Sequence, residues 1–321
     1  MVTTIYHLLR TARPRQWSKN LAVFAAPVFL GTFFYPNVFY KAFLAFVIFC
    51  AISSAGYYIN DLVDAEKDLN HPVKKNRAIA SGKVSKVEAI FVIIFLLGIS
   101  IPVAYFYVGS FFAIAALTYI FLQLIYSFYL RNIIILDALL VATLFIIRVF
   151  AGGFATNISI SSWLILATTG LSLLLAFGKR RSEKTILSKY DAEKSSKTRE
   201  TLRHYPDSLL DSMISMSAGF TLVAYALFTF QTSPQDMNPI LQKLLPSTLQ
   251  SPRWMMLTVP LVIYGIARYL FVIYEKREGE SPELVLISDK PLLSTVIIWI
   301  ILVLVITTLF PGFNSSNLLS L

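Results

Sequence analysis

Long apolar stretches recur along the whole chain and are separated by short polar segments. Each is close to the roughly 20 residues that an α-helix needs to cross a bilayer. Strands or loops exposed to lipid would leave backbone groups without hydrogen bonds, and the stretches lack the alternating pattern of a membrane barrel. We therefore predict an all-α fold, a polytopic membrane helical bundle of about nine transmembrane helices around a central cavity. The predicted spans are 20–34, 39–60, 87–107, 110–129, 133–153, 162–179, 213–231, 254–275 and 291–310.

The composition agrees with a chain whose solvent is mostly lipid. Of 321 residues, 56% are hydrophobic and 14% are charged, which is too apolar for a soluble domain. We expect one membrane domain over residues 1–321. Pro27 interrupts the first apolar stretch and no small-residue cleavage site follows, so a removable signal peptide is not expected. Cys50, the single cysteine, lies in an apolar stretch, which excludes an internal disulfide and a cysteine-based metal cluster.

The basic residues are distributed very unequally between the two sides of the predicted bundle. Of the 28 lysines and arginines, 23 fall on one side, three on the other and two within spans. The positive-inside rule then places the N-terminus and the long loops 61–86 and 179–211 in the cytoplasm, as in a prokaryotic cytoplasmic membrane protein. The net charge of +10 thus reflects topology, although it also suits anionic lipids and phosphorylated substrates. Nucleic acid is not an expected partner.

Polar residues begin where the second predicted span ends. If the helix continues, Asn60, Asp64 and Asp68 share one face, and Asp61 lies one residue round from Asn60. Three carboxylates and an amide this close repel one another unless a cation lies between them, and hard oxygen ligands select Mg²⁺ or Mn²⁺. The alternative is a solvated helix end with Asp68 paired to a neighbouring lysine.

A short basic segment follows directly and includes His71, Lys74 and Arg77. Mg²⁺ held by few carboxylates completes its coordination with water and substrate phosphate, and neighbouring cations neutralise the remaining phosphate charge. Carboxylates followed by cations therefore predict a diphosphate site. The alternative is that these cations only obey the positive-inside rule, and His71 by itself is expected to be structural.

Four further ionisable residues lie in or next to predicted spans. Arg131 follows the fourth span and is expected either to contact a phosphate or to anchor the helix end. Asp137, Arg148 and Arg268 lie within spans, where a charge is costly without a partner. The sequence alone does not pair them.

A second basic segment begins at the end of the sixth predicted span and continues past Tyr190. Lys179 and Glu183 are four residues apart and so share a helical face. With Arg180 beside them, they predict a second phosphate-binding region. The alternative is a solvated basic loop with an internal salt bridge.

These motifs together resemble the UbiA superfamily of membrane prenyltransferases. The matching segments are Arg13 to Asn20, Asn60 to Asp68 with His71, Pro72 and Arg77, Tyr126 to Arg131, Arg148 to Gly153, Lys179 to Glu183, and Glu283 to Pro291. The aspartate motif is specific to the superfamily, and the flanking segments resemble its phosphoribosyl-transferring branch. The resemblance extends over nearly the whole chain and implies a nine-helix fold. It implies magnesium binding at Asn60, Asp61 and Asp64, with Asp68 joining them as a catalytic residue.

Two departures from the superfamily pattern bear on the substrate. Members that act on aromatic acceptors have a second aspartate-rich motif after the sixth helix, where this chain has Lys179-Arg180-Arg181-Ser182-Glu183. Basic residues there would suit the 5-phosphate of phosphoribosyl pyrophosphate. Ala78 stands where the superfamily often has proline, which affects the expected loop conformation.

The resemblance implies transfer of phosphoribose from phosphoribosyl pyrophosphate to a polyprenyl phosphate of the decaprenyl type, with release of diphosphate. The residues expected to bind substrate are Lys19, Lys74, Arg77, Tyr126, Arg131, Lys179, Arg180, Glu183 and Tyr190. A phosphate dianion is already a nucleophile, so no catalytic serine, cysteine or histidine is needed. Two rival functions are prenyl transfer from a prenyl diphosphate to an aromatic acceptor, and transport of a lipid or solute. Few charges lie deep in the spans, which argues against transport. A homo-oligomer is left open.

Overall fold

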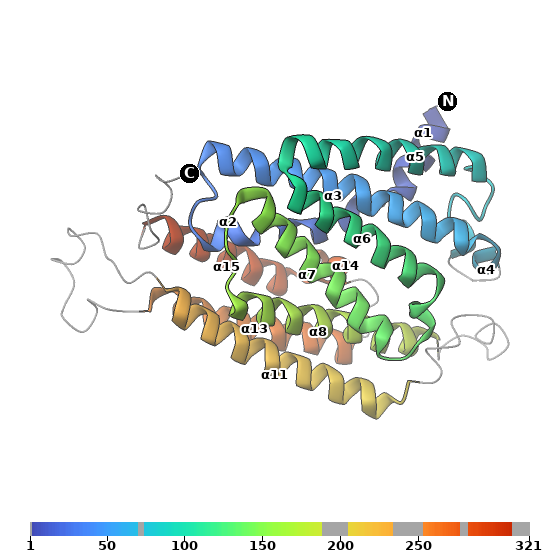
Figure 1. The fold of residues 1–321 in the computed structure, drawn as a ribbon. Helices are drawn as coiled ribbons and strands as arrows, with labels where there is room; N and C mark the ends of the chain where they lie inside the picture. Colours follow the sequence, from blue (N-terminus) through green and yellow to red (C-terminus); the bar gives the residue numbers. More distant parts are fainter. Residues whose placement is uncertain (1, 70–73, 188–204, 234–252, 277–281, 310–321) are drawn as a thin grey trace, which may run out of the picture.

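The computed structural model describes residues 2–69, 74–187, 205–233, 253–276 and 282–309, and the regular elements in these ranges are all helices (Figure 1). Eight of them are long and apolar enough to cross a membrane. They lie side by side with their axes in roughly one direction (Figure 1). The chain is therefore an integral membrane protein, as predicted. The spanning helices are α3 (Pro36–Val63), α5 (Lys86–Val103), α6 (Ser110–Phe128), α7 (Leu136–Thr156), α8 (Ser162–Leu187), α11 (Asp207–Thr232), α13 (Val259–Phe271, the central part of a span over Trp254–Glu275) and α15 (Lys290–Leu309).

Shorter helical segments connect these spans. A π-helical segment, η3 (Ala104–Val108), extends α5, and another, η7 (Val272–Lys276), extends α13. The remaining short segments are α1 (Val2–Thr11), α2 (Ala25–Phe29), α4 (Ala65–Leu69), α14 (Pro282–Ser288), and the 3₁₀-helices η1 (Pro14–Phe24), η2 (Lys74–Asn76), η4 (Leu130–Asn132) and η6 (Trp254–Thr258).

The first predicted span differs from a simple transmembrane helix. In place of one α-helix over 20–34, the chain forms η1 and then the five-residue α2. This segment lies inside the bundle, because Asn20 and Val23 are fully buried and η1 packs against both α3 and α7. At Gly152 of α7 a Cβ atom would collide with the Val23 carbonyl oxygen, so only glycine allows the two backbones to approach this closely. The irregular helix η1 is thus closely packed against α3 and α7.

Local sequence signals explain where several helices begin. Pro36 occupies the first turn of α3, where its missing N–H costs nothing. Before α5, the Ser85 hydroxyl accepts a hydrogen bond from the Glu88 N–H at 3.1 Å, and the Glu88 carboxylate accepts one from the Ser85 N–H at 2.8 Å. This reciprocal cap starts α5 at the residue after Ser85.

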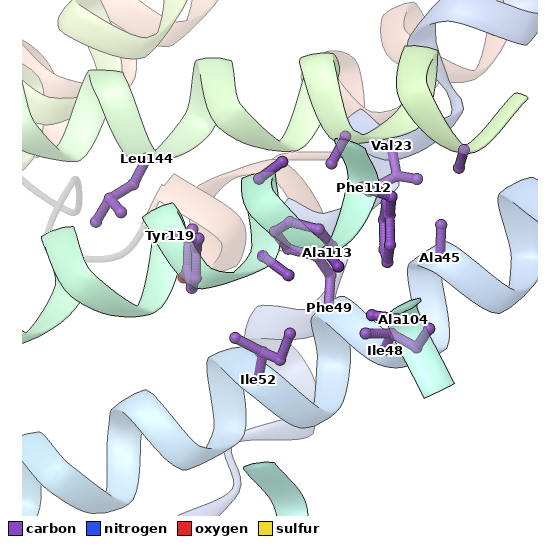
Figure 2. Packing of buried hydrophobic residues seen from close by; sticks show 14 residues of the cluster. Val23, Ala45, Ile48, Phe49, Ile52, Ala104, Phe112, Ala113, Tyr119 and Leu144 are labelled. Carbon is purple, nitrogen blue, oxygen red and sulfur yellow. The ribbon is translucent and has the colours of Figure 1, made fainter. Parts of the chain in front are cut away.

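Aromatic residues fill much of the core between η1, α3, α6 and α7. Figure 2 shows Phe49 of α3 against Phe112 and Tyr119 of α6, with ring centroids 5.7 and 5.4 Å away. Val23 of η1 and Leu144 of α7 belong to the same cluster. A second cluster joins α8, α11 and α13 on the other side of α7. These two cores hold the helices that carry the polar residues described next.

Candidate active site

The carboxylates of the aspartate motif lie where α3 ends, at the end of the bundle where α6 and α8 also end (Figure 1). Helix α3 stops at Val63, and α4 begins two residues later. The backbone nevertheless keeps helical bonds through the break, since the Asp64 N–H donates to the Asn60 carbonyl at 3.0 Å and the Asp68 N–H donates to the Asp64 carbonyl at 2.8 Å. The predicted continuous helix is thus interrupted at Asp64, but the spacing of the motif is preserved. We call Asn60, Asp61, Asp64 and Asp68 the acidic cluster.

Two arginines bind one oxygen of Asp61, whose side chain is 5% exposed. Nη2 of Arg13 lies 2.5 Å from its Oδ1, and Nη1 of Arg77 lies 3.1 Å from the same atom. Nη1 of Arg77 also donates to Oδ2 of Asp68 at 2.7 Å. Arg77 therefore links two carboxylates of the cluster. The ion pair of Asp68 is thus with this arginine, whereas the alternative interpretation expected a neighbouring lysine.

Arg131 binds Asp64 with two parallel hydrogen bonds. Nη1 to Oδ2 and Nη2 to Oδ1 both measure 2.6 Å, and Asn60 donates to the same Oδ2 at 3.3 Å. A two-bond guanidinium–carboxylate pair is the strong form of this interaction. The structure thus pairs Arg131 with the acidic cluster, and its expected contact with a phosphate stays a prediction. This pair ties η4, after α6, to the end of α3.

The donor set of the acidic cluster suits a hard divalent cation, because it consists of carboxylate and amide oxygens. In the described residues no three acidic, histidine or cysteine side chains gather closely enough to form a metal-holding group. The carboxylates contact guanidinium groups, and burial raises the pKa of the Asp68 carboxyl despite the nearby Arg77 and Lys74 charges. A metal ion here would therefore compete with arginine for the oxygens of Asp61 and Asp64. The assignment of Asn60, Asp61 and Asp64 as metal ligands stays a prediction.

A second polar group consists of residues from η1, α6 and α8. Lys19 of η1 donates from its Nζ to Gln16 at 3.5 Å. Nζ of Lys179 lies 3.9 Å from Oε1 of Glu183, and 37% of the Lys179 side chain is exposed. We call Lys19 and Lys179 the lysine pair.

Arg180, predicted to bind phosphate, is instead bound to carboxylates of the protein. Its side chain is 4% exposed, and its Nε donates to Oδ2 of Asp137 at 2.5 Å. Its Nη1 donates to Glu183 at 2.8 Å and its Nη2 to the Tyr126 hydroxyl at 3.2 Å. We revise its expected role accordingly. Burial between two carboxylates makes Arg180 the residue that positions Glu183 and Tyr126, with Lys179 the more exposed cation.

Asp137 and Tyr205 form the deeper part of this network. The buried Tyr205 hydroxyl donates to Oδ1 of Asp137 at 2.6 Å and accepts the Ile135 N–H at 2.6 Å. Burial and the Asp137 carboxylate raise the pKa of Tyr205 above its usual value. Ile135 has φ 71°, which is unusual for a β-branched residue, and its neighbours close a γ-turn through the Leu136 N–H and the Ile134 carbonyl. Tyr205 had no signal in the sequence, because its partners are about 70 positions away.

The two other arginines within spans also have partners. Arg148 donates to Asn20, to the Leu144 carbonyl and to the Tyr119 hydroxyl, at 2.7 to 2.9 Å. Arg268 makes two bonds to Asp289, at 2.9 and 3.0 Å. Neither arginine is bonded to a residue of the acidic cluster in these contacts.

The remaining predicted site residues differ in what the structure says of them. Lys74 lies in η2 and is half-buried near Asp68. Ala78, the departure from the superfamily pattern, is buried beneath the loop. Tyr190 and His71 lie outside the described residues, so their proposed roles stay predictions. Arg13 was missed as a site residue, since nothing in its neighbouring residues indicated that it reaches Asp61, 48 positions away.

A model of the UbiA prenyltransferase family matches residues 20–180. This range covers half of the chain and includes the aspartate motif, Arg131 and Arg180. The chain belongs to the UbiA prenyltransferase family, in agreement with the resemblance of its motifs.

Relatives and solved structures agree with this membership. The chain is 34% identical to decaprenyl-phosphate phosphoribosyltransferase of Mycolicibacterium smegmatis, over 91% of this chain and 90% of the relative. It is 31% identical to the protein of the same name from Corynebacterium glutamicum, over 95% and 88%. A UbiA homolog from Archaeoglobus fulgidus, solved with GPP and Mg²⁺, superposes with a TM-score of 0.65 at 18% identity, over 94% of this chain and 99% of that one. At this identity the last comparison shows the common fold.

Proposed function

We propose that this chain is a magnesium-dependent transferase that moves 5-phosphoribose from phosphoribosyl pyrophosphate to a polyprenyl phosphate and releases diphosphate. The arrangement that carries the proposal is the acidic cluster at the end of α3 together with the lysine pair contributed by η1 and α8. Phosphoribosyl pyrophosphate has a diphosphate at one end and a 5-phosphate at the other. One end needs a metal and cations, and the other needs cations alone. The similarity to two phosphoribosyltransferases over about nine tenths of the chain supports the same reaction.

In the proposed reaction one bond breaks and one forms at the anomeric carbon of ribose. The bond from this carbon to the diphosphate oxygen breaks, and the diphosphate leaves with the electron pair. A phosphate oxygen of the lipid forms the new bond, so the product is a polyprenyl-phosphoryl-phosphoribose. Positive charge develops on the ribose ring in the transition state, and the leaving group becomes more negative. The protein's main contributions are therefore orientation and neutralisation of the leaving group.

The residues of the acidic cluster have defined parts in this scheme. Asn60, Asp61 and Asp64 would hold Mg²⁺, which when bound supplies neutralisation of diphosphate charge. Arg77 and Arg131 provide guanidinium groups beside the diphosphate. The lysine pair binds the 5-phosphate, and Arg180 keeps Glu183 and Tyr126 in place near the ribose.

The membrane location follows from the second substrate. A polyprenyl phosphate has a long apolar tail that must stay in lipid, while its phosphate head must reach the polar end of the bundle. We further propose that this end faces the cytoplasm, because its excess of lysine and arginine predicts that orientation. Phosphoribosyl pyrophosphate is available on that side.

The activity is tested with purified protein in detergent. Radiolabelled phosphoribosyl pyrophosphate and polyprenyl phosphate should give a labelled lipid product when Mg²⁺ is present, and EDTA should abolish the product until Mg²⁺ is restored. A parallel reaction with a prenyl diphosphate and an aromatic acid should give none. Product only in the parallel reaction would reject the proposal in favour of aromatic prenyl transfer. Since detergent leaves no compartments, product formation would exclude transport as the whole activity.

The metal ligands are tested by substitution within one segment. Asp61→Ala and Asp64→Ala should each reduce turnover by at least about 10²-fold, because a leaving group without its metal loses its main stabilisation. Glu66→Gln is the matched control, since its side chain lies in the same segment, is 89% exposed and only approaches Lys86 at 4.0 Å. It should keep parental turnover. Parental turnover in either aspartate variant would reject the metal assignment.

The orientation is tested by labelling cysteines from outside intact cells. Parent protein should not react with a membrane-impermeant maleimide, because Cys50 is buried. Asn37→Cys, at the exposed start of α3, should react, whereas Glu66→Cys should react only after the cells are lysed. The opposite pattern would place the polar end outside.

A further inference from the structure

Arg13 has an unusual backbone conformation at the start of η1. Its φ of 52° and ψ of 60° are left-handed, which non-glycine residues rarely adopt. The next residue is Pro14, and the residue before a proline ordinarily favours an extended conformation. Trp17 and the Ala12 carbonyl, which both bond to the Ser54 hydroxyl, fix the chain on α3 on either side of this turn. The fold therefore holds Arg13 in a costly conformation, and such positions are concentrated at functional sites.

This conformation directs the Arg13 guanidinium to Asp61. Nη2 lies 2.5 Å from Oδ1, and the guanidinium carbon lies 5.0 Å from the centroid of the Tyr57 ring, one helical turn before Asp61. The Arg13 side chain is 24% exposed, so the protein does not enclose it fully. Among the described residues, Arg13 binds one carboxylate of the cluster, whereas Arg77 binds two. Arg13 would therefore have to leave one carboxylate, and Arg77 two, to bind another anion.

The charges of the acidic cluster are already balanced without a metal. Asp61, Asp64 and Asp68 carry three negative charges, and the three guanidinium groups that bind them, from Arg13, Arg77 and Arg131, carry three positive charges. A divalent cation arriving alone would add two positive charges to a largely buried neutral group, where like charges repel strongly. A metal that arrives with diphosphate would not add this positive charge, because the negative diphosphate balances it. The diphosphate would also offer arginine a new acceptor.

We propose that Arg13 couples metal binding to diphosphate binding by exchanging Asp61 for the diphosphate. Without ligand its guanidinium occupies Oδ1 of Asp61 and excludes the metal. With ligand it moves to a diphosphate oxygen while it stays over the Tyr57 ring, and Oδ1 of Asp61, which then keeps only the longer contact with Arg77 at 3.1 Å, can bind the ion. This inference rests on the proposed function, because it takes the acidic cluster as the metal and diphosphate site. It goes further in stating that neither ligand binds well without the other.

The test measures binding of both ligands by equilibrium dialysis with radioactive Mn²⁺ and radioactive inorganic diphosphate, each counted on the protein. In the parent, diphosphate should tighten Mn²⁺ binding by about tenfold or more, within the usual range of coupling between two ligands. Arg13→Gln should bind Mn²⁺ alone more tightly than the parent, and diphosphate should then add little. Arg15→Gln removes the same charge from the same segment, at an exposed position, and should behave as the parent.

A second variant separates the charge of Arg13 from the turn that it occupies. Arg13→Lys keeps a positive charge next to Asp61, so it should bind Mn²⁺ alone as weakly as the parent. If Arg13→Lys instead binds it as tightly as Arg13→Gln, the turn and not the charge controls the site, and the inference is wrong. Equal or weaker Mn²⁺ binding by Arg13→Gln would also overturn it. If the parent binds neither ligand, the proposed function fails as well, whereas the other two results reject the role of Arg13 alone.

Discussion

Asp137 of α7 and Arg180 of α8 form a buried ion pair, with 2.5 Å between Oδ2 and Nε. Each lies in a span, where an isolated charge would be costly. The pair is completed by Tyr205 on the Asp137 side and by Glu183 and Tyr126 on the Arg180 side. The ionisable residues in this part of the bundle therefore stabilise one another. The lysine pair beside them remains more exposed.

Removing one partner of this pair should destabilise the protein far more than removing a neighbouring charge. Arg180→Gln leaves Asp137 buried without its cation, and such losses cost about 3–5 kcal/mol. Arg181→Gln is the matched control, because Arg181 is adjacent, half-buried and paired to Asp211, whose side chain is 40% exposed. Its loss should cost about 1 kcal/mol or less. Thermal unfolding in detergent measures both. An unchanged midpoint for Arg180→Gln, with weaker binding of phosphoribosyl pyrophosphate, would return Arg180 to its predicted role as a phosphate ligand.

Tyr205→Phe should lower stability in a way that depends on pH. The variant leaves the buried Asp137 carboxylate without its hydroxyl donor and the Ile135 N–H without its acceptor, which costs about 1–3 kcal/mol. The pKa of Tyr205 is raised in the folded protein, so the hydroxyl's contribution is complete below the usual tyrosine pKa of about 10 and is lost as pH rises above it. The difference in midpoint between parent and variant should therefore be constant from pH 7 to 9 and shrink at higher pH. A difference that grows with pH would contradict the hydrogen-bond arrangement.

Two glycines in spans offer a matched test of the packing between η1 and α7. Gly152→Ala places a Cβ on the Val23 carbonyl oxygen, whereas a Cβ at Gly219 of α11 meets nothing within 4 Å. Overpacking of this kind costs about 1–3 kcal/mol or prevents folding. Gly219→Ala should be neutral or slightly stabilising, because alanine favours helix. Yield of monodisperse protein and unfolding midpoint are the measurements. Equal behaviour of the two variants would show that η1 does not lie against α7 as described.

The spans were predictable because lipid imposes one requirement on every crossing segment. A backbone in hydrocarbon must bond to itself, so apolar stretches such as 87–107 and 291–310 had to be helices, and α5 and α15 lie there. The segment over 20–34 was predicted to be a transmembrane helix by the same rule, but in the structure it forms η1 and α2. Its first part, η1, packs against α3 and α7, so contacts with these helices help to determine its conformation. No pattern within the segment records those neighbours.

The site was predictable where its residues are close in sequence and not where they are distant. Asn60 and Asp64 are one turn apart, and the structure keeps them in contact. The cations that bind the motif come from elsewhere, and Arg131 reaches Asp64 across 67 positions. Asp137 did carry a signal, since a carboxylate within a span requires a partner. The sequence could not identify that partner as Arg180, because the adjacent Lys179 and Arg181 carry the same charge.

Arg148 provides the last prediction, because it is buried deep in α7 and makes its hydrogen bonds to neutral groups. Its Nε donates to Asn20 at 2.8 Å and its Nη2 to the Tyr119 hydroxyl at 2.7 Å, so one guanidinium joins η1, α6 and α7. Arg148→Lys keeps the charge but has one nitrogen in place of three, and it cannot reach both acceptors with this planar geometry. Each lost hydrogen bond to a charged donor costs about 1.5–3 kcal/mol, so the variant should unfold at a clearly lower temperature. Asn20→Ala removes one acceptor of the same guanidinium, and the two changes combined should cost less than the sum of their separate effects. Strict additivity in that double-mutant cycle would mean that the two side chains act independently, and the contact between η1 and α7 would then need another explanation.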